Sequence, residues 1–228
     1  MSDDDIQQET FSYYNERAPE HDLVYMGKGP AIRQHADEYT KDVAKIKEMA
    51  SHFGSGRAID IACGTGFWSP YYAPNCNHVT FLDQSVAALS ECKKRIAALE
   101  LSDKPRFIQG DLFDVNLPVS SFDCALIGFL LSHLIPELEE RLFDRLSKIF
   151  KPSAQLMLID SAWSEKREKH RQRSGIEERS LEDGRKFRVY KKYFEKSGID
   201  RMFGKFHFSI NDIYFGSMLF AVIGDRTP

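Results

Sequence analysis

The chain has 228 residues, of which 42% are hydrophobic and 29% are charged. This composition is typical of a folded globular protein and excludes collagen, a coiled coil and a wholly disordered chain. The 31 basic and 34 acidic residues leave a net charge of −3, so we do not expect a nucleic-acid-binding protein. At this length we expect a single domain, residues 1–228, with appendages.

Localisation and metal content are also predicted at this level. Met1 to Asp5 is acidic, whereas a secretory signal or transit peptide would be basic, and the longest apolar run, Cys124 to Leu131, is too short to cross a bilayer. We therefore expect a cytoplasmic protein. The four cysteines form no C-x-x-C pair, so we expect neither a disulfide framework nor a metal site.

In chain order, two helices come first, at residues 6–17 and 31–52, and form an N-terminal helical cap over residues 1–53. Strand and helix patterns then alternate through a core at 54–160. Its strands are expected at 57–61, 79–82, 106–109, 123–127 and 155–159. Ser85 is placed to cap the helix after the second strand, and Pro136 lies near the start of the helix after the fourth. This alternation predicts a doubly wound, mostly parallel, Rossmann-like sheet.

The C-terminal third has a different character. Residues 161–192 hold eleven Lys or Arg against six acids, which defines a basic segment at 161–198 on the substrate side. Lys166 to Arg173 is expected to be a solvated helical face. Residues 201–210 and 214–223 are predicted as two strands joined at 211–213, an antiparallel closing hairpin within 199–228. With the hairpin the sheet would have seven strands.

A glycine turn follows the first predicted strand, in the run Asp60-Ile61-Ala62-Cys63-Gly64-Thr65-Gly66-Phe67-Trp68. A strand that leads into Gly-x-Gly and then a helix brings the backbone close to a ligand at the carboxyl edge of the sheet. Ser69 replaces the third glycine of the dinucleotide fingerprint, which disfavours a pyrophosphate-binding NAD site. We expect both Gly64 and Gly66 to admit the ligand.

Two acids complete this pattern. Asp83 ends the second strand, 23 residues after Asp60, and Asp111 ends the third. A carboxylate at the first position can accept from both ribose hydroxyls, and one at the second can accept from the adenine amine. The combination predicts a site for an adenosine without phosphates.

These residues, with the closing hairpin, resemble class I S-adenosylmethionine-dependent methyltransferases over about residues 10–228. Ala62 departs from the family's usual glycine, and we expect it to be tolerated because the position need not take positive φ. The chain is most similar to small bacterial phosphonate O-methyltransferases, on Tyr13-Tyr14 with Arg17-Ala18, the Gly-Thr-Gly-aromatic-Trp turn and Asp183-Gly184-Arg185-x-Phe187-Arg188 with Lys191.

The resemblance implies S-adenosylmethionine as cofactor and S-adenosylhomocysteine as product. It implies that Tyr14, Arg17 and Trp68 hold the methionine end. The full candidate cofactor set is Tyr14, Arg17, Ala62, Gly64, Gly66, Trp68, Asp83, Gln84, Asp111, Leu112 and Phe129.

His133 follows the fourth strand beside this edge and is the candidate catalytic residue. Arg179 and Lys191 are candidate substrate-binding residues because the basic segment suits an anionic small molecule, and Tyr25 is the third candidate. The sequence thus predicts methyl transfer to an oxygen of a small carboxylate or phosphonate. Two alternatives stay open: methylation of a neutral or amine small molecule, and a catalytically silent cofactor-binding module.

Overall fold

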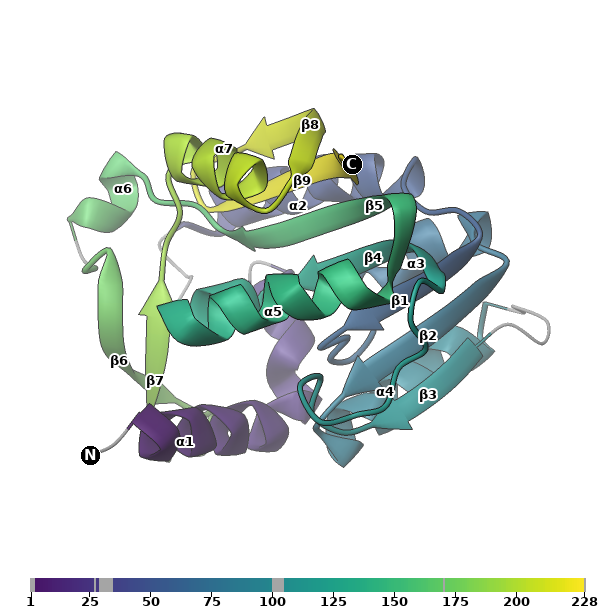
Figure 1. The fold of residues 1–228 in the computed structure, drawn as a ribbon. Helices are drawn as coiled ribbons and strands as arrows, with labels where there is room; N and C mark the ends of the chain where they lie inside the picture. Colours follow the sequence, from purple (N-terminus) through teal and green to yellow (C-terminus); the bar gives the residue numbers. More distant parts are fainter. Residues whose placement is uncertain (1–2, 27, 29–34, 100–104, 170, 228) are drawn as a thin grey trace.

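The computed structural model describes residues 3–26, 28, 35–99, 105–169 and 171–227. Its main sheet has seven strands in the order β3-β2-β1-β4-β5-β9-β8 (Figure 1). The first five strands in the chain run parallel to one another, and β9 pairs antiparallel with both β5 and β8. The predicted doubly wound, mostly parallel, seven-stranded sheet is therefore confirmed.

The strands of this sheet are β1 (Arg57–Ile61), β2 (His78–Asp83), β3 (Pro105–Gln109), β4 (Phe122–Gly128), β5 (Phe150–Ser161), β8 (Phe208–Phe215) and β9 (Leu219–Arg226). One face is covered by α2 (Ala36–Ser51), α3 (Ser69–Tyr72) and α4 (Val86–Ala97), and the other by α5 (Pro136–Ile149) and α7 (Lys196–Lys205). Neighbouring residues of β1 belong to opposite faces, since Ala58 packs in the first core and Ile59 in the second.

The local signals in the sequence explain several boundaries. Ser85 Oγ accepts a hydrogen bond from the backbone N–H of Ala88 at 3.1 Å and so caps α4, as predicted. Pro136 is the first residue of α5, where its missing N–H costs no helical hydrogen bond. The short 3-10 turns are η1 (Ala18–Val24), η3 (Ala73–Asn75) and η4 (Leu131–His133).

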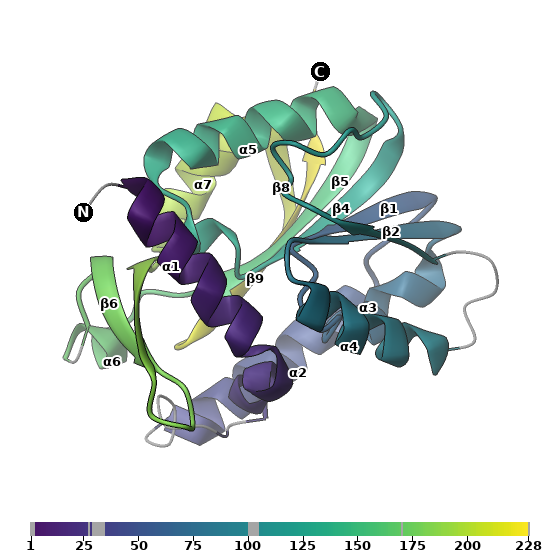
Figure 2. The same ribbon diagram turned by 90° about the horizontal axis from the view of Figure 1, so that it is seen from below.

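A second, two-stranded sheet stands apart from the first. The strands β6 (Ser174–Ser180) and β7 (Lys186–Lys192) pair antiparallel, and α1 (Asp3–Glu16) packs against them through Tyr13, Leu181 and Val189. Figure 2 shows α1 running between this pair and α4. The N-terminal helix and the basic segment therefore close over the same side of the molecule.

The predicted C-terminal hairpin exists, but its boundaries were wrong. Residues 201–205 belong to α7, whose buried side chains Ile199, Met202 and Phe203 have helical spacing. The turn lies at 216–218 rather than at 211–213. Asp42 of α2 accepts hydrogen bonds from the backbone N–H groups of Met218 and Leu219, and the register shifts beside Asp212.

The prediction for 31–52 is met over Ala36–Ser51, and residues 31–34 lie outside the described part of the chain. Within that part, no helix is both long and apolar enough to span a membrane, and no cluster of His, Cys, Asp or Glu is arranged to hold a metal.

Candidate active site

A cavity of about 830 Å³ opens where β1, β2, β3 and β4 end. This volume lies within the range of small-molecule and cofactor sites. Nine of the eleven candidate cofactor residues line it: Tyr14, Ala62, Gly64, Trp68, Asp83, Gln84, Asp111, Leu112 and Phe129. The topology has thus brought the ends of β1, β2 and β3 together, as the sequence predicted.

The glycine turn is shaped by contacts on both of its sides. Gly64 has φ +54°, lines the cavity and would meet only His21 Cε1, at 3.8 Å, if it carried a Cβ. Gly66 has φ +70°, and an added Cβ would lie 2.7 Å from Cys92 Sγ in α4. Gly66 does not line the cavity. Of the two glycines predicted to admit the ligand, only Gly64 therefore lines the cavity, and Gly66 allows α4 to pack closely.

The position of Ala62 corrects a further expectation. Its φ is +54°, in the left-handed region that glycine adopts most easily. The prediction that this position need not take positive φ was wrong. The backbone turns at this point whichever residue occupies it, and Ala62 bears a strain of about 1 kcal/mol relative to glycine.

The carboxylate of Asp83 organises the turn. Its two oxygens accept from the backbone N–H groups of Gly64 and Ser85, each at 2.8 Å, and burial raises its pKa. Each oxygen keeps a second lone pair that can accept from a ribose hydroxyl. Asp111 accepts from Gln84 Nε2 and from the backbone N–H of Phe113, each at 2.8 Å, which fixes the neighbouring loop.

Beneath the turn, Asp60 is a buried acid. Tyr72 Oη donates to it at 2.7 Å and Ser69 Oγ at 3.3 Å, while burial raises its pKa to about 7. Trp68 is also buried, and its Nε1 has no hydrogen-bond partner in the described structure. An adenosine cofactor fits this cavity. The carboxylates of Asp83 and Asp111 can accept its hydrogen bonds, and the open space beside Gly64 and the cavity volume can hold it.

A second cavity, of about 760 Å³, adjoins the first. The two share five wall residues: Tyr14, His21, Tyr25, Phe129 and His133. In this wall the Tyr25 ring stacks on that of Phe67, with centroids 4.3 Å apart, and is tilted against that of Phe129 at 5.4 Å. The aromatic wall places the predicted catalytic histidine between the two spaces.

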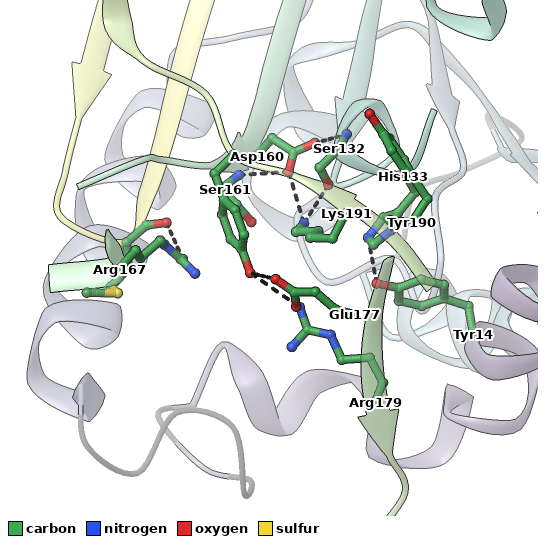
Figure 3. Close-up of polar contacts among 12 residues, drawn as sticks. Tyr14, Ser132, His133, Asp160, Ser161, Arg167, Glu177, Arg179, Tyr190 and Lys191 are labelled. Atoms are coloured by element: carbon green, nitrogen blue, oxygen red, sulfur yellow. Dashed lines mark hydrogen bonds and ion pairs between the residues drawn. The ribbon is translucent and has the colours of Figure 1, made fainter. Parts of the chain in front are cut away.

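His133 is held by two hydrogen bonds (Figure 3). Its Nδ1 lies 2.7 Å from the backbone carbonyl oxygen of Tyr190, which can only accept, so Nδ1 carries the proton. Its Nε2 then accepts from Tyr14 Oη at 2.6 Å. Burial, and next the charge of Lys191, hold the pKa of His133 well below its ordinary value. The ring is therefore neutral at pH 7 and is a weak base.

Lys191 and Arg179 both line the second cavity, as does Arg17, which does not line the first. Lys191 Nζ donates to Ser132 Oγ at 2.5 Å and lies 3.5 Å from Asp160 Oδ1. Arg179 pairs with Glu177 at 2.6 Å (Figure 3). The predicted substrate-binding residues are thus together, and Lys191 retains a third N–H for a ligand.

Sequence reasoning did not assign Tyr193 and Arg167 to this cavity. Tyr193 and Arg167 line it, although Lys166 to Arg173 had been expected to form a solvated helical face. The helix α6 covers only Glu165–Glu168, and Arg167 is 8% exposed. No pattern in the sequence indicates this burial, because it comes from packing against Tyr39 of α2 and Met218.

Comparisons with known proteins find similarity to methyltransferases. A family model described as a methyltransferase domain matches residues 58–153. A demethylmenaquinone methyltransferase of Clavibacter sepedonicus is 28% identical over 118 residues, 52% of this chain and 46% of the relative. A phosphatidylethanolamine N-methyltransferase of Cereibacter sphaeroides is 23% identical over 116 residues, 50% and 56% respectively. The chain spans about half the length of these curated relatives.

Solved structures match over more of the chain. A DhpI–SAH complex has a TM-score of 0.73 at 21% identity and covers 100% of both chains, and a DhpI–SAM–HEP complex has 0.72 at 22%, covering 98% and 99%. A SAM-dependent methyltransferase from Methanosarcina mazei has 0.62 at 18%, covering 75% and 92%.

The fold and the cofactor edge define a class I, Rossmann-like methyltransferase architecture. A family model of a methyltransferase domain matches part of this fold, and the chain is similar to S-adenosylmethionine-dependent methyltransferases of solved structure.

The Asp83 carboxylate should contribute directly to cofactor affinity. Asp83→Ala should weaken S-adenosylhomocysteine binding at least tenfold, because a charged acceptor of two hydroxyl groups is worth about 1.5–3 kcal/mol. Isothermal titration calorimetry measures the effect. Asp123→Ala is the matched control, since Asp123 also accepts a backbone N–H, that of Arg57, but at the opposite end of β1. An Asp83→Ala protein that binds as tightly as the control would refute this role.

Proposed function

We propose that the protein methylates an anionic oxygen of a small acid, with S-adenosylmethionine as methyl donor. The observation that carries the proposal is the charge of the second cavity. Its walls hold Arg17, Lys28, Lys166, Arg167, Arg171, Arg179 and Lys191 against only Glu20 and Glu178 among the described residues. Such a site favours a carboxylate or phosphonate and disfavours an ammonium group.

The state of His133 supports the same acceptor class. Transfer to an alcohol or an ammonium group requires a base to remove a proton, and the Nε2 of His133 has a lowered pKa and already accepts from Tyr14. An ionised acid needs no such base. Tyr14 is therefore proposed to hold His133, and His133 to orient the acceptor, in addition to the contact with the methionine end that the resemblance implies.

The bound cofactor supplies an electrophilic methyl group on its sulfonium. The acceptor oxygen forms a bond to the methyl carbon as the carbon–sulfur bond breaks, so an ester and S-adenosylhomocysteine result and no proton is transferred. The protein's own residues align and shield this step. Lys191 and Arg179 hold the acid, and Tyr25 and Phe129 form the apolar wall that excludes water.

The experiment is an acceptor screen with radiolabelled cofactor. Propionate, benzoate and ethylphosphonate represent acids, and ethanolamine, catechol and an RNA oligonucleotide represent the other classes. We expect label only in the acids, with the methyl ester identified by mass spectrometry. Turnover confined to the other classes would overturn the proposal, and binding without turnover of any acceptor would favour a silent module.

The pH dependence gives a further prediction. Burial lowers the pKa of Lys191 to about 8, so its ammonium is fully charged only below that pH. For a carboxylate acceptor, whose own ionisation is complete throughout, kcat/KM should fall above pH 8, approaching tenfold per pH unit. Lys191→Arg, which stays charged, should remove that fall. A native profile that is flat from pH 7 to 9.5 would contradict the assignment of Lys191.

A further inference from the structure

Arg167 is one of two buried cations of the second cavity, and unlike the other, Lys191, it has no partner of opposite charge among the described residues. Its Nη2 donates to the backbone carbonyl of Met218 at 2.7 Å and to Tyr39 Oη at 3.1 Å. No carboxylate of the described residues lies within ion-pair distance of it, and its buried Nε has no hydrogen-bond partner. By contrast, Arg179 and Arg171 both pair with Glu177, and Lys191 lies beside Asp160.

This arrangement is unfavourable without a ligand. Arg167 as a residue is 8% exposed and its Nε is buried, so the guanidinium has lost most of its water, and neutral oxygens replace only part of that solvation. Because arginine stays protonated in proteins, it cannot relieve the cost by losing its charge. An anion bound in the cavity would supply the missing partner.

The location of Arg167 shows which part of a ligand it could reach. Three cations surround the Tyr193 side chain: Arg167 Cζ lies 4.6 Å and Lys191 Nζ 5.6 Å from its ring centroid, and Arg179 Nη2 lies 3.5 Å from its hydroxyl. Figure 3 shows Arg167 on the side of Lys191 away from the Tyr14–His133 pair. Arg167 thus lies away from the Tyr14–His133 wall that the two cavities share and close to Lys191 and Arg179, the cations proposed to bind the acid.

We propose that Arg167 binds a second anionic group of the acceptor, so that the preferred substrate is a short molecule with an acid at each end. This rests on the proposed function: one acid group is methylated beside His133 and Lys191, and the other stays free at Arg167. The short spacing around Tyr193 requires a short linker, as in 2-carboxyethylphosphonate or glutarate.

The test compares each diacid with a monoacid of similar size. The pairs are 2-carboxyethylphosphonate with propylphosphonate and glutarate with butyrate. We expect the native enzyme to favour the diacid at least tenfold in kcat/KM. Arg167→Gln should remove most of this preference by lowering the value for the diacid much more than that for the monoacid, and Arg167→Lys should keep part of it. Calorimetry of the diacids with the S-adenosylhomocysteine complex should show the same order.

Arg106→Gln is the control, because Arg106 is an exposed arginine on β3, at the far edge of the sheet. Equal kcat/KM for diacid and monoacid in the native enzyme would overturn this inference and leave the proposed function intact, whether or not the variants fold. An equal loss on both acids in an Arg167→Gln protein of native melting temperature would also overturn it. Absence of methylation of every acid would instead refute the proposed function.

Discussion

Gly64→Val should abolish measurable cofactor binding while leaving the protein folded. The side chain would project from the glycine turn into the cavity, where His21 Cε1 is the nearest atom at 3.8 Å. The added bulk would occupy space that the ligand needs, and we expect the dissociation constant for S-adenosylhomocysteine to rise at least about a hundredfold, or about 2.7 kcal/mol.

Backbone strain must be separated from this steric effect, since valine is unfavourable at φ +54°. Gly184→Val provides the comparison, because Gly184 has φ +89°, lies in the exposed turn between β6 and β7 and would meet no atom within 4 Å. Both variants should lose stability in thermal unfolding, but only Gly64→Val should lose the ligand. If Gly64→Val binds within threefold of Gly184→Val, the turn does not contact the cofactor.

The cofactor-binding part of the site could be predicted from sequence because the residue patterns that indicate it are local. A strand, a glycine turn and an acid at the next strand end lie within about one βαβ unit, and parallel pairing brings such strand ends to one edge. Asp83 and Gly64, 19 residues apart, are joined by a hydrogen bond for this reason. The error at Ala62 arose because a backbone dihedral depends on the path of the loop rather than on residue type.

The second cavity, where the acceptor is proposed to bind, could be predicted only in outline. The excess of positive charge in 161–192 was visible, but not which cations are buried. Arg167 and Arg185 are similar in sequence terms, yet Arg167 is buried against α2 and Arg185 is an exposed partner of Asp183. That difference is set by contacts between segments more than 100 residues apart, such as Arg167 with Tyr39, and periodicity carries no information on these.

The predicted strand boundaries near the C-terminus were wrong for a related reason. The segment before β8 is rich in Phe and Met, residues found in both helices and strands, and Gly216 rather than Asn211 marks the turn. Asp42, from the other end of the chain, fixes that turn by accepting from Met218 and Leu219. The tertiary contact of Asp42 therefore determines that the turn forms at 216–218 and not at 211–213.

Lys191→Met should lower kcat/KM for an acid acceptor by about ten- to a hundredfold, mainly through KM. Lys191 is 5% exposed, so loss of its charge-assisted bond to the acid would cost about 1.5–3 kcal/mol. Cofactor affinity should be unchanged, since Lys191 does not line the first cavity. The buried Asp160 would keep its backbone donors Ser132 and Ser161 after the loss of the ammonium, which favours retention of the fold.

Lys186→Met is the matched control, because Lys186 lies on the same strand, is exposed and lines neither of the two cavities. Steady-state kinetics with the best acid of the screen and calorimetry with S-adenosylhomocysteine would be measured for both variants. An unchanged KM in a folded Lys191→Met enzyme would remove Lys191 from the acceptor site. A loss of cofactor affinity equal to the loss of kcat/KM would instead show that Lys191 supports the architecture shared by the two cavities. The expected split, with KM raised and cofactor binding native, assigns the positive charge of Lys191 to the acid.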